Sequence, residues 1–128
     1  MVTYGTPFSG FSVSDVPAAK AFYADVIGLD VEESEGMLHL ALGDGHHVLV
    51  YPKGEAHVPA SFTVLNLPVE DVSAAVRELS ERGVSFKRYE GMPQDDDGVM
   101  KGNGPDIAWF TDPSGNVVSV IGAPGPGR

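Results

Sequence analysis

Two stretches of the chain carry apolar residues at helical spacing, and they can be aligned with each other. Residues 13–23 and 69–79 share valine, aspartate, valine, alanine and alanine at one constant offset of 56 positions, which indicates an internal repeat. Asp15 and Asp71 each stand where a carboxylate can accept the free amide hydrogens of a first helical turn. Gly28 and Gly83 stand where a left-handed C-cap is needed. The pattern predicts two amphipathic helices, each packed on a sheet.

Short apolar runs around both helices predict β-strands. One run precedes each helix, and three follow each, separated by glycine-rich turns. The expected strands are 8–13, 31–35, 37–42 and 47–51 in the first copy, and 61–67, 84–89, 107–111 and 117–121 in the second. The order βαβββ therefore occurs twice. We expect an α+β fold in which two βαβββ modules, about 6–52 and about 60–122, form curled mixed sheets around a cleft within a single domain, 1–128.

Composition and charge exclude several classes of protein. The 42% hydrophobic and 20% charged residues are proportions of a globular domain. There is no cysteine, which rules out disulfides and cysteine-held metal centres. A formal charge of −10 repels phosphate backbones and anionic lipids, so we expect neither nucleic acid nor a membrane as partner. The start lacks the features of a signal peptide, so a cytoplasmic location is expected, and the absence of a phosphate loop or G-x-G-x-x-G suggests no nucleotide cofactor.

The chain resembles the vicinal oxygen chelate superfamily, the glyoxalase / bleomycin-resistance / dioxygenase fold. The resemblance covers nearly the whole sequence, and it depends on the order and spacing of several short pieces. These pieces are 11–15, 22–23, 27–29, 69–72 with 83–84, and 108–116, which contains the Asp-Pro-Ser-Gly turn. Together they indicate the fold, whereas an activity has to be argued from the site.

The resemblance implies four positions for metal ligands, one in the first and one in the last strand of each module. Metal-using relatives carry histidine and glutamate there, whereas this chain carries Phe8, Leu49, Val64 and Ser119. Three apolar side chains and a hydroxyl cannot hold a catalytic divalent cation. We therefore expect no metal and no other cofactor.

The four histidines are the remaining route to a metal site. Strand alternation puts His47 on the same face as Leu49 and His46 on the opposite face. The orientation of His39 is open, and His57 lies in the linker between the modules. Isolated histidines on strands more often serve as polar surface or as hydrogen-bond partners.

Alternation along the strands also predicts a ligand cleft, because every second residue faces the same side. Ile107 and Trp109 are included because the matching aromatic position lines the binding site in relatives. The candidate cleft residues are Phe8, Ser12, His47, Leu49, Tyr51, Phe62, Val64, Asn66, Ile107, Trp109 and Ser119. The alternative is that the large apolar members fill a core. The glycine-rich loop 91–106 is either a lid, with Lys101 and Asn103 as candidates to meet a ligand, or simple slack.

An apolar cleft with a few polar groups is typical of small-molecule sites. The leading interpretation is a metal-independent, small-molecule-binding protein that sequesters or carries an aromatic or amphipathic metabolite or drug. The alternative is an enzyme, either a lyase, isomerase or dioxygenase-like protein with displaced metal ligands or an acid–base catalyst using His47 or Tyr51. A structural or regulatory module with a filled cleft is a third possibility. No catalytic residue is identified, and no serine stands in the sharp-turn context of a nucleophile. Isolated chains of this fold usually need a partner to cover their sheets, so a homodimer is expected.

Overall fold

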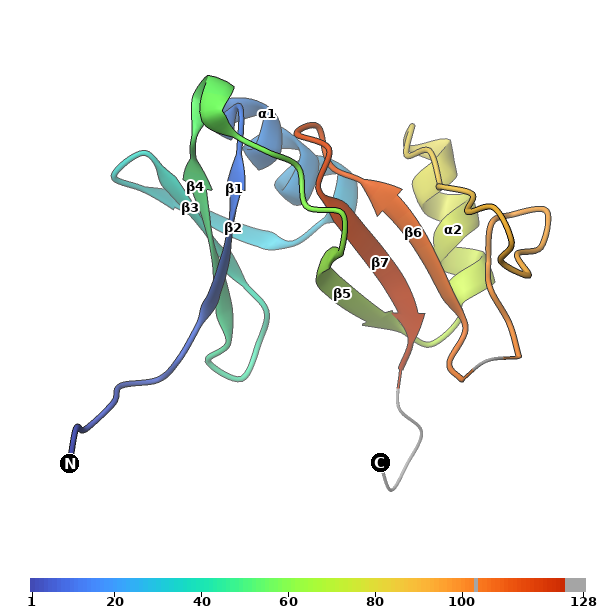
Figure 1. Cartoon of the computed structure of the whole chain (residues 1–128), viewed down its shortest axis with the longest axis horizontal. Helices are drawn as coiled ribbons and strands as arrows, with labels where there is room; N and C mark the ends of the chain where they lie inside the picture. The colour runs from blue at the N-terminus through green and yellow to red at the C-terminus, as the bar shows by residue number, and fades with distance from the viewer. Residues whose placement is uncertain (103, 124–128) are drawn as a thin grey trace. The chain divides into compact units, whose positions relative to one another are not determined.

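The computed structural model describes residues 1–102 and 104–123. The chain divides into two compact units, Met1–Pro59 and Ala60–Arg128. Each unit contains one mixed sheet and one main helix, so the fold is α+β with two unclosed sheets, as the sequence predicted (Figure 1). In the described residues, no helix is long and apolar enough to cross a membrane.

The first unit is a four-stranded sheet in the order β1-β4-β3-β2. Strand β1 is parallel to β4, and the other pairs are antiparallel. The expected single helix begins as α1, Val16–Ala21, and continues as a π-helix, Phe22–Ile27. The strands are β1 Ser9–Val13, β2 Asp30–Ser34, β3 Met37–Ala41 and β4 His47–Pro52, followed by a short 3₁₀ helix, Gly54–Ala56.

One face of this sheet is buried under the helix. Leu38, Leu40 and Val50 on that face have no exposed surface. The helix contributes Tyr23, which is also fully buried and lies 6.0 Å from the Phe11 ring centroid to centroid. The period-2 alternation read from the sequence therefore separates a buried face from an open one.

Strand β2 ends at Ser34, one residue earlier than the sequence predicted. Glu35, expected in the strand, instead has a φ of 55°, and Gly36 has a φ of 77°. Ser34 pairs directly with Met37, so these two residues form the whole loop. Positive φ at both central positions is the geometry of a type I′ turn, which suits the twist of a hairpin.

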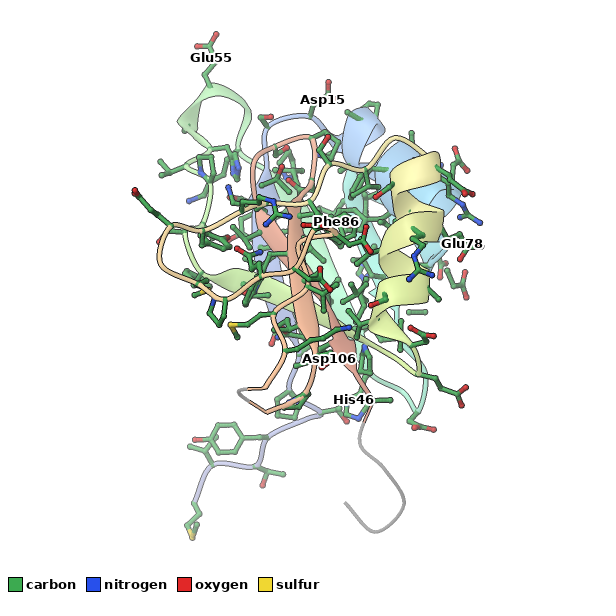
Figure 2. All side chains as sticks on the ribbon, turned by 90° about the vertical axis from the view of Figure 1, so that its right-hand side faces the viewer. Asp15, His46, Glu55, Glu78, Phe86 and Asp106 are labelled. Carbon is green, nitrogen blue, oxygen red and sulfur yellow. The ribbon has the colours of Figure 1, made fainter. Side chains whose placement is uncertain are left out.

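The second unit has the strand order of the first without its fourth strand. Its sheet has the order β5-β7-β6, with β5 parallel to β7 and β6 antiparallel to β7. The elements are β5 Thr63–Val69, α2 Val72–Glu81, β6 Ile107–Thr111 and β7 Val117–Gly122. Helix α2 buries Val72, Val76 and Leu79, and its Glu78 points outwards (Figure 2).

Both helix starts have the predicted caps. The Asp15 carboxylate accepts from the Ala18 amide and the Asp71 carboxylate from the Ala74 amide, each at 3.0 Å. Gly28 has the left-handed φ of 87° expected after the first helix. The repeat at an offset of 56 thus has a structural meaning, because it aligns equivalent helix starts.

The predicted strand 84–89 is wrong as a regular strand. It forms one isolated bridge to β6, between Phe86 and Phe110. A side chain takes the place of a neighbouring strand, since Gln94 Oε1 accepts from the Tyr89 amide at 2.7 Å and Gln94 Nε2 donates to the Lys87 carbonyl at 2.9 Å. Backbone groups satisfied by a glutamine side chain are not available for a longer ladder.

The Asp-Pro-Ser-Gly turn between β6 and β7 is held by a buried aspartate. Asp112 Oδ1 accepts from the amides of Ser114 and Asn116, each at 2.9 Å, and Oδ2 accepts from Asn116 Nδ2 at 3.2 Å. Asn116 Oδ1 in turn accepts from the Ala60 amide at 3.3 Å. The turn is therefore tied to the residue at which the second unit begins.

Candidate functional site

The first sheet has one face that its helix does not cover. We call this the open face. All of its residues are half-buried or exposed. Strand register brings Leu49 beside Gly10 on one side and beside His39 on the other, so Leu49 lies at the centre of the face. The open face comprises Gly10 and Ser12 of β1, Asp30, Glu32 and Ser34 of β2, Met37, His39 and Ala41 of β3, and His47, Leu49 and Tyr51 of β4.

Three rings form an aromatic shelf at one end of the open face. Phe8 precedes β1 and stacks on His47, with centroids 4.9 Å apart and an interplanar angle of 25°. His39 lies next to His47 at 6.1 Å and 45°. This contact settles the orientation of His39, which the sequence left open. Phe8 is 58% exposed, so most of its ring remains accessible to a ligand.

A hollow of about 380 Å³ adjoins the shelf. Its lining residues come from the last three strands of the sheet, and all belong to the open face. They are Asp30, Glu32, Ser34, His39, Ala41 and His47. The sequence prediction included only His47 of these six. Asp30 and Glu32 were missed because charged residues on a strand next to a turn are read by default as solvated surface.

Ser12 forms a side-chain contact that the sequence did not predict. Its hydroxyl lies 2.7 Å from Nδ1 of His57, which is 45 residues away along the chain. Which atom donates depends on the imidazole tautomer. Tyr51 is the register partner of Ser12, and its ring extends towards Gly10. The Ser12–His57 pair lies at the opposite end of the open face from Phe8.

The second sheet also has a face opposite the one that packs on helix α2, and it holds other predicted site residues. Trp109, Ser119 and Asn66 are register partners across β6, β7 and β5. Ser119 is fully buried and donates its hydroxyl to Asn66 Oδ1 at 2.6 Å. Ile107 shares this face, two residues before Trp109 on β6.

Tyr89 extends this second face and was not among the predicted site residues. Its ring meets Trp109 edge-on, at 5.4 Å and 89°. Burial raises the pKa of the Tyr89 phenol. The Lys87 ammonium lies 5.7 Å from the Tyr89 centroid. The sequence analysis placed Tyr89 in a regular strand. The segment 84–89 is irregular instead, and it brings Tyr89 beside Trp109.

Phe62 and Val64 do not continue the simple row expected with Asn66. Strand β5 begins at Thr63, and Phe62 before it is 70% exposed. The register of β5 on β7 shifts between Thr63 and Leu65. A bulge of this kind inserts one residue and breaks the alternation on which the expectation rested.

Side-chain hydrogen bonds hold part of the glycine-rich loop 91–106, between Asp95 and Val99. Asp95 Oδ1 accepts from the amides of Asp97 and Val99, each at 3.0 Å. Burial opposes ionisation of Asp95, but these bonds and the nearby Lys101 outweigh it, so the pKa of this carboxyl is lowered. Lys101 Nζ lies 3.7 Å from Asp95 Oδ2, and the other lid candidate, Asn103, lies outside the described residues.

The positions at which the resemblance implies metal ligands do not fit a divalent cation. Phe8 and Leu49 belong to the first unit, and Val64 and Ser119 to the second. None offers an imidazole or a carboxylate, and the Ser119 hydroxyl already donates to Asn66. Elsewhere in 1–102 and 104–123, no three histidine or acidic side chains are grouped so as to hold a metal ion.

Several solved structures are similar to this chain over most of its length. TnmS3, an antibiotic binding protein from Streptomyces sp. CB03234, is 26% identical over 96% of this chain and 100% of its own, with a TM-score of 0.65. A glyoxalase/bleomycin resistance protein from the same organism is 28% identical over 90% of this chain and 99% of its own, with a TM-score of 0.60. The oxidase ChaP-H2, 16% identical over 98% of both chains with a TM-score of 0.65, shares the fold.

No curated protein sequence matches this chain. The family profile described as Glyoxalase/Bleomycin resistance protein/Dioxygenase superfamily matches residues 8–120. That range contains both helices, most of both sheets and the buried Asp112 turn. The chain therefore belongs to the glyoxalase/bleomycin resistance protein/dioxygenase superfamily.

Proposed function

We propose that this protein binds a small aromatic or amphipathic molecule on the open face of the first sheet, without a metal ion, and sequesters or carries it. The observation that carries the proposal is the aromatic shelf of Phe8, His47 and His39 beside a hollow of about 380 Å³. Exposed rings favour stacking with a planar ligand. A hollow of this size is within the range of small-molecule sites.

The likeness to an antibiotic binding protein supports the same proposal. TnmS3 is 26% identical, and the match extends over the whole of that chain. A binding function in a similar chain makes a binding function here the simpler expectation. The proposed lack of a metal rests on the donor chemistry of Phe8, Leu49, Val64 and Ser119.

A thermal-shift screen tests the proposal. Planar aromatic antibiotics and polycyclic phenols form one set, and sugar phosphates and nucleotides form the other. Ligand at 100 times its dissociation constant adds about 2.7 kcal/mol to the free energy of unfolding, so a binder should raise the melting temperature by several degrees. We expect such binders in the aromatic set, with or without EDTA. Binding confined to the phosphate set, or abolished by EDTA, would contradict the proposal.

Metal-free acid–base catalysis is the second candidate function. It is favoured by the contact of Ser12 with His57 at 2.7 Å and by Tyr51, the strand partner of Ser12 on the same face. Any binder from the screen can be incubated with the protein and followed by mass spectrometry. Chemical conversion that is lost in His57→Ala or Tyr51→Phe would replace the carrier function with an enzymatic one.

We further propose that the protein acts as a cytoplasmic homodimer. Strands β1 and β2 are the edge strands of the first sheet, and edge strands invite pairing with another chain. Sedimentation equilibrium at micromolar concentration reads the mass directly, and a monomer would contradict it.

A further inference from the structure

We infer that the hollow beside the aromatic shelf takes a protonated amine carried by the ligand. The inference rests on the proposed function and specifies the ligand class for the same face. It concerns the pocket lined by Asp30, Glu32, Ser34, His39, Ala41 and His47.

The strand register explains the shape of the hollow. Ala41 pairs with Asp30 on one side and with His47 on the other. Because Ala41 has the smallest side chain of the three, it leaves space between a carboxylate and an imidazole. Two residues further along β2, Glu32 pairs with His39. Ala41 therefore forms the floor, with the carboxylates of β2 on one side and His47 on the other, and His39 lies beside Glu32.

The hollow carries unbalanced negative charge. No lysine or arginine lines it. In the described part of the chain, neither Asp30 nor Glu32 is in an ion pair, whereas the neighbouring Glu33 binds Lys20 Nζ at 3.1 Å. Glu33 pairs with the buried Leu38 and so belongs to the other face of the strand. Lys20 therefore neutralises the covered side of the sheet and leaves the open side acidic.

The lining groups match the hydrogen-bonding needs of an ammonium. An ammonium has three donors and no acceptor. The carboxylates of Asp30 and Glu32 and the hydroxyl of Ser34 are acceptors, and each neutral imidazole offers one more. A ring attached to the amine would then reach the shelf, where the Phe8 ring is stacked on His47 and remains 58% exposed. A single ligand can thus use the ring stack and the charge together.

Three probes that share one ring system test the inference. Isothermal titration is performed with 1-naphthylmethylamine, 1-naphthylmethanol and 1-naphthylacetate. Charge-assisted hydrogen bonds, reduced by solvent exposure, should make the amine bind about tenfold more tightly than the alcohol. The acetate should bind more weakly than both. The preference for the amine should shrink as sodium chloride is raised, because the carboxylates are exposed.

Two adjacent residues provide a matched pair of variants. Glu32→Gln should remove most of the amine preference while leaving the affinity for the alcohol unchanged. Glu33→Gln, on the opposite face of the same strand, should preserve the preference. Thermal unfolding of both variants controls for folding, and exposure of both side chains predicts little change.

The outcomes separate this inference from the proposed function. If all three probes bind with equal affinity, the amine subsite is refuted and the aromatic binding face stands. The subsite is refuted in the same way if Glu32→Gln keeps the full preference, or if Glu33→Gln loses it. If none of the probes binds at millimolar concentration, both the binding face and its amine subsite are contradicted.

Discussion

Replacing Asp112 with alanine is expected to destabilise the protein by about 3–5 kcal/mol. The carboxylate is 4% exposed and accepts three hydrogen bonds, two from backbone amides and one from the Asn116 side chain. Alanine would leave those donors buried without this acceptor. An unsatisfied buried donor costs about 1–3 kcal/mol. Urea denaturation followed by tryptophan fluorescence measures the loss, since Trp109 lies on the neighbouring strand β6.

Asp96→Ala is the matched control for this prediction. Asp96 is an exposed aspartate in a loop of the same unit, and its loss should change stability by less than about 0.5 kcal/mol. Asp112→Asn should fall between the two, because one carbonyl oxygen remains as acceptor. If Asp112→Ala unfolds at the same urea concentration as Asp96→Ala, the Asp-Pro-Ser-Gly turn does not stabilise the second sheet in the way described.

Removing the aromatic shelf should produce the largest loss of binding. The double variant Phe8→Ala/His47→Ala deletes a stacked pair at 4.9 Å together with the surface that a planar ligand would cover. Aromatic contacts and their buried area together account for about 2 kcal/mol at a partly exposed site. That value corresponds to a roughly 30-fold larger dissociation constant. Titration of 1-naphthylmethylamine measures the change.

His46→Ala is the control for the shelf. His46 directly precedes His47, is exposed and lies in the turn before β4 (Figure 2), so its loss should leave the affinity unchanged. Phe8 is outside any strand and His47 is half-buried, so the double variant should remain folded. Wild-type affinity in the double variant, or an equal loss in His46→Ala, would show that the ligand binds elsewhere.

The elements that depend on local sequence were predicted well. Helix starts follow from Asp15 and Asp71, whose carboxylates act within three residues. Strand β6 was predicted at its observed bounds, Ile107–Thr111. Alternation correctly assigned His47, Leu49 and Tyr51 to one face, because a regular strand keeps its period of two.

The prediction failed where residues distant in sequence decide the structure. Side-chain bonds from Gln94 replace the strand expected at 84–89, and no periodicity reports such a contact. The bulge after Thr63 depends on how β5 meets β7. The Ser12–His57 pair joins two segments 45 residues apart.

The acidic hollow depends on hairpin register, which the sequence contained in part. A two-residue turn at Glu35 and Gly36 makes Glu32 the partner of His39. The sequence analysis placed Glu35 in the strand, and this concealed the pairing of Glu32 with His39. A shift of one residue in the register of a strand moves every side chain to the other face. Recognition of the type I′ turn would have oriented His39 from sequence alone.

Methyl NMR tests the binding face most directly, through nuclear Overhauser effects from naphthyl ring protons of 1-naphthylmethylamine to labelled leucine side chains. Leu49 occupies the centre of the open face, whereas Leu38 and Leu40 point to the covered face and have no exposed surface. We predict cross-peaks from the probe to the Leu49 methyls and none to Leu38 or Leu40. A bound probe that gives no cross-peak to Leu49 would contradict ligand binding on the first sheet.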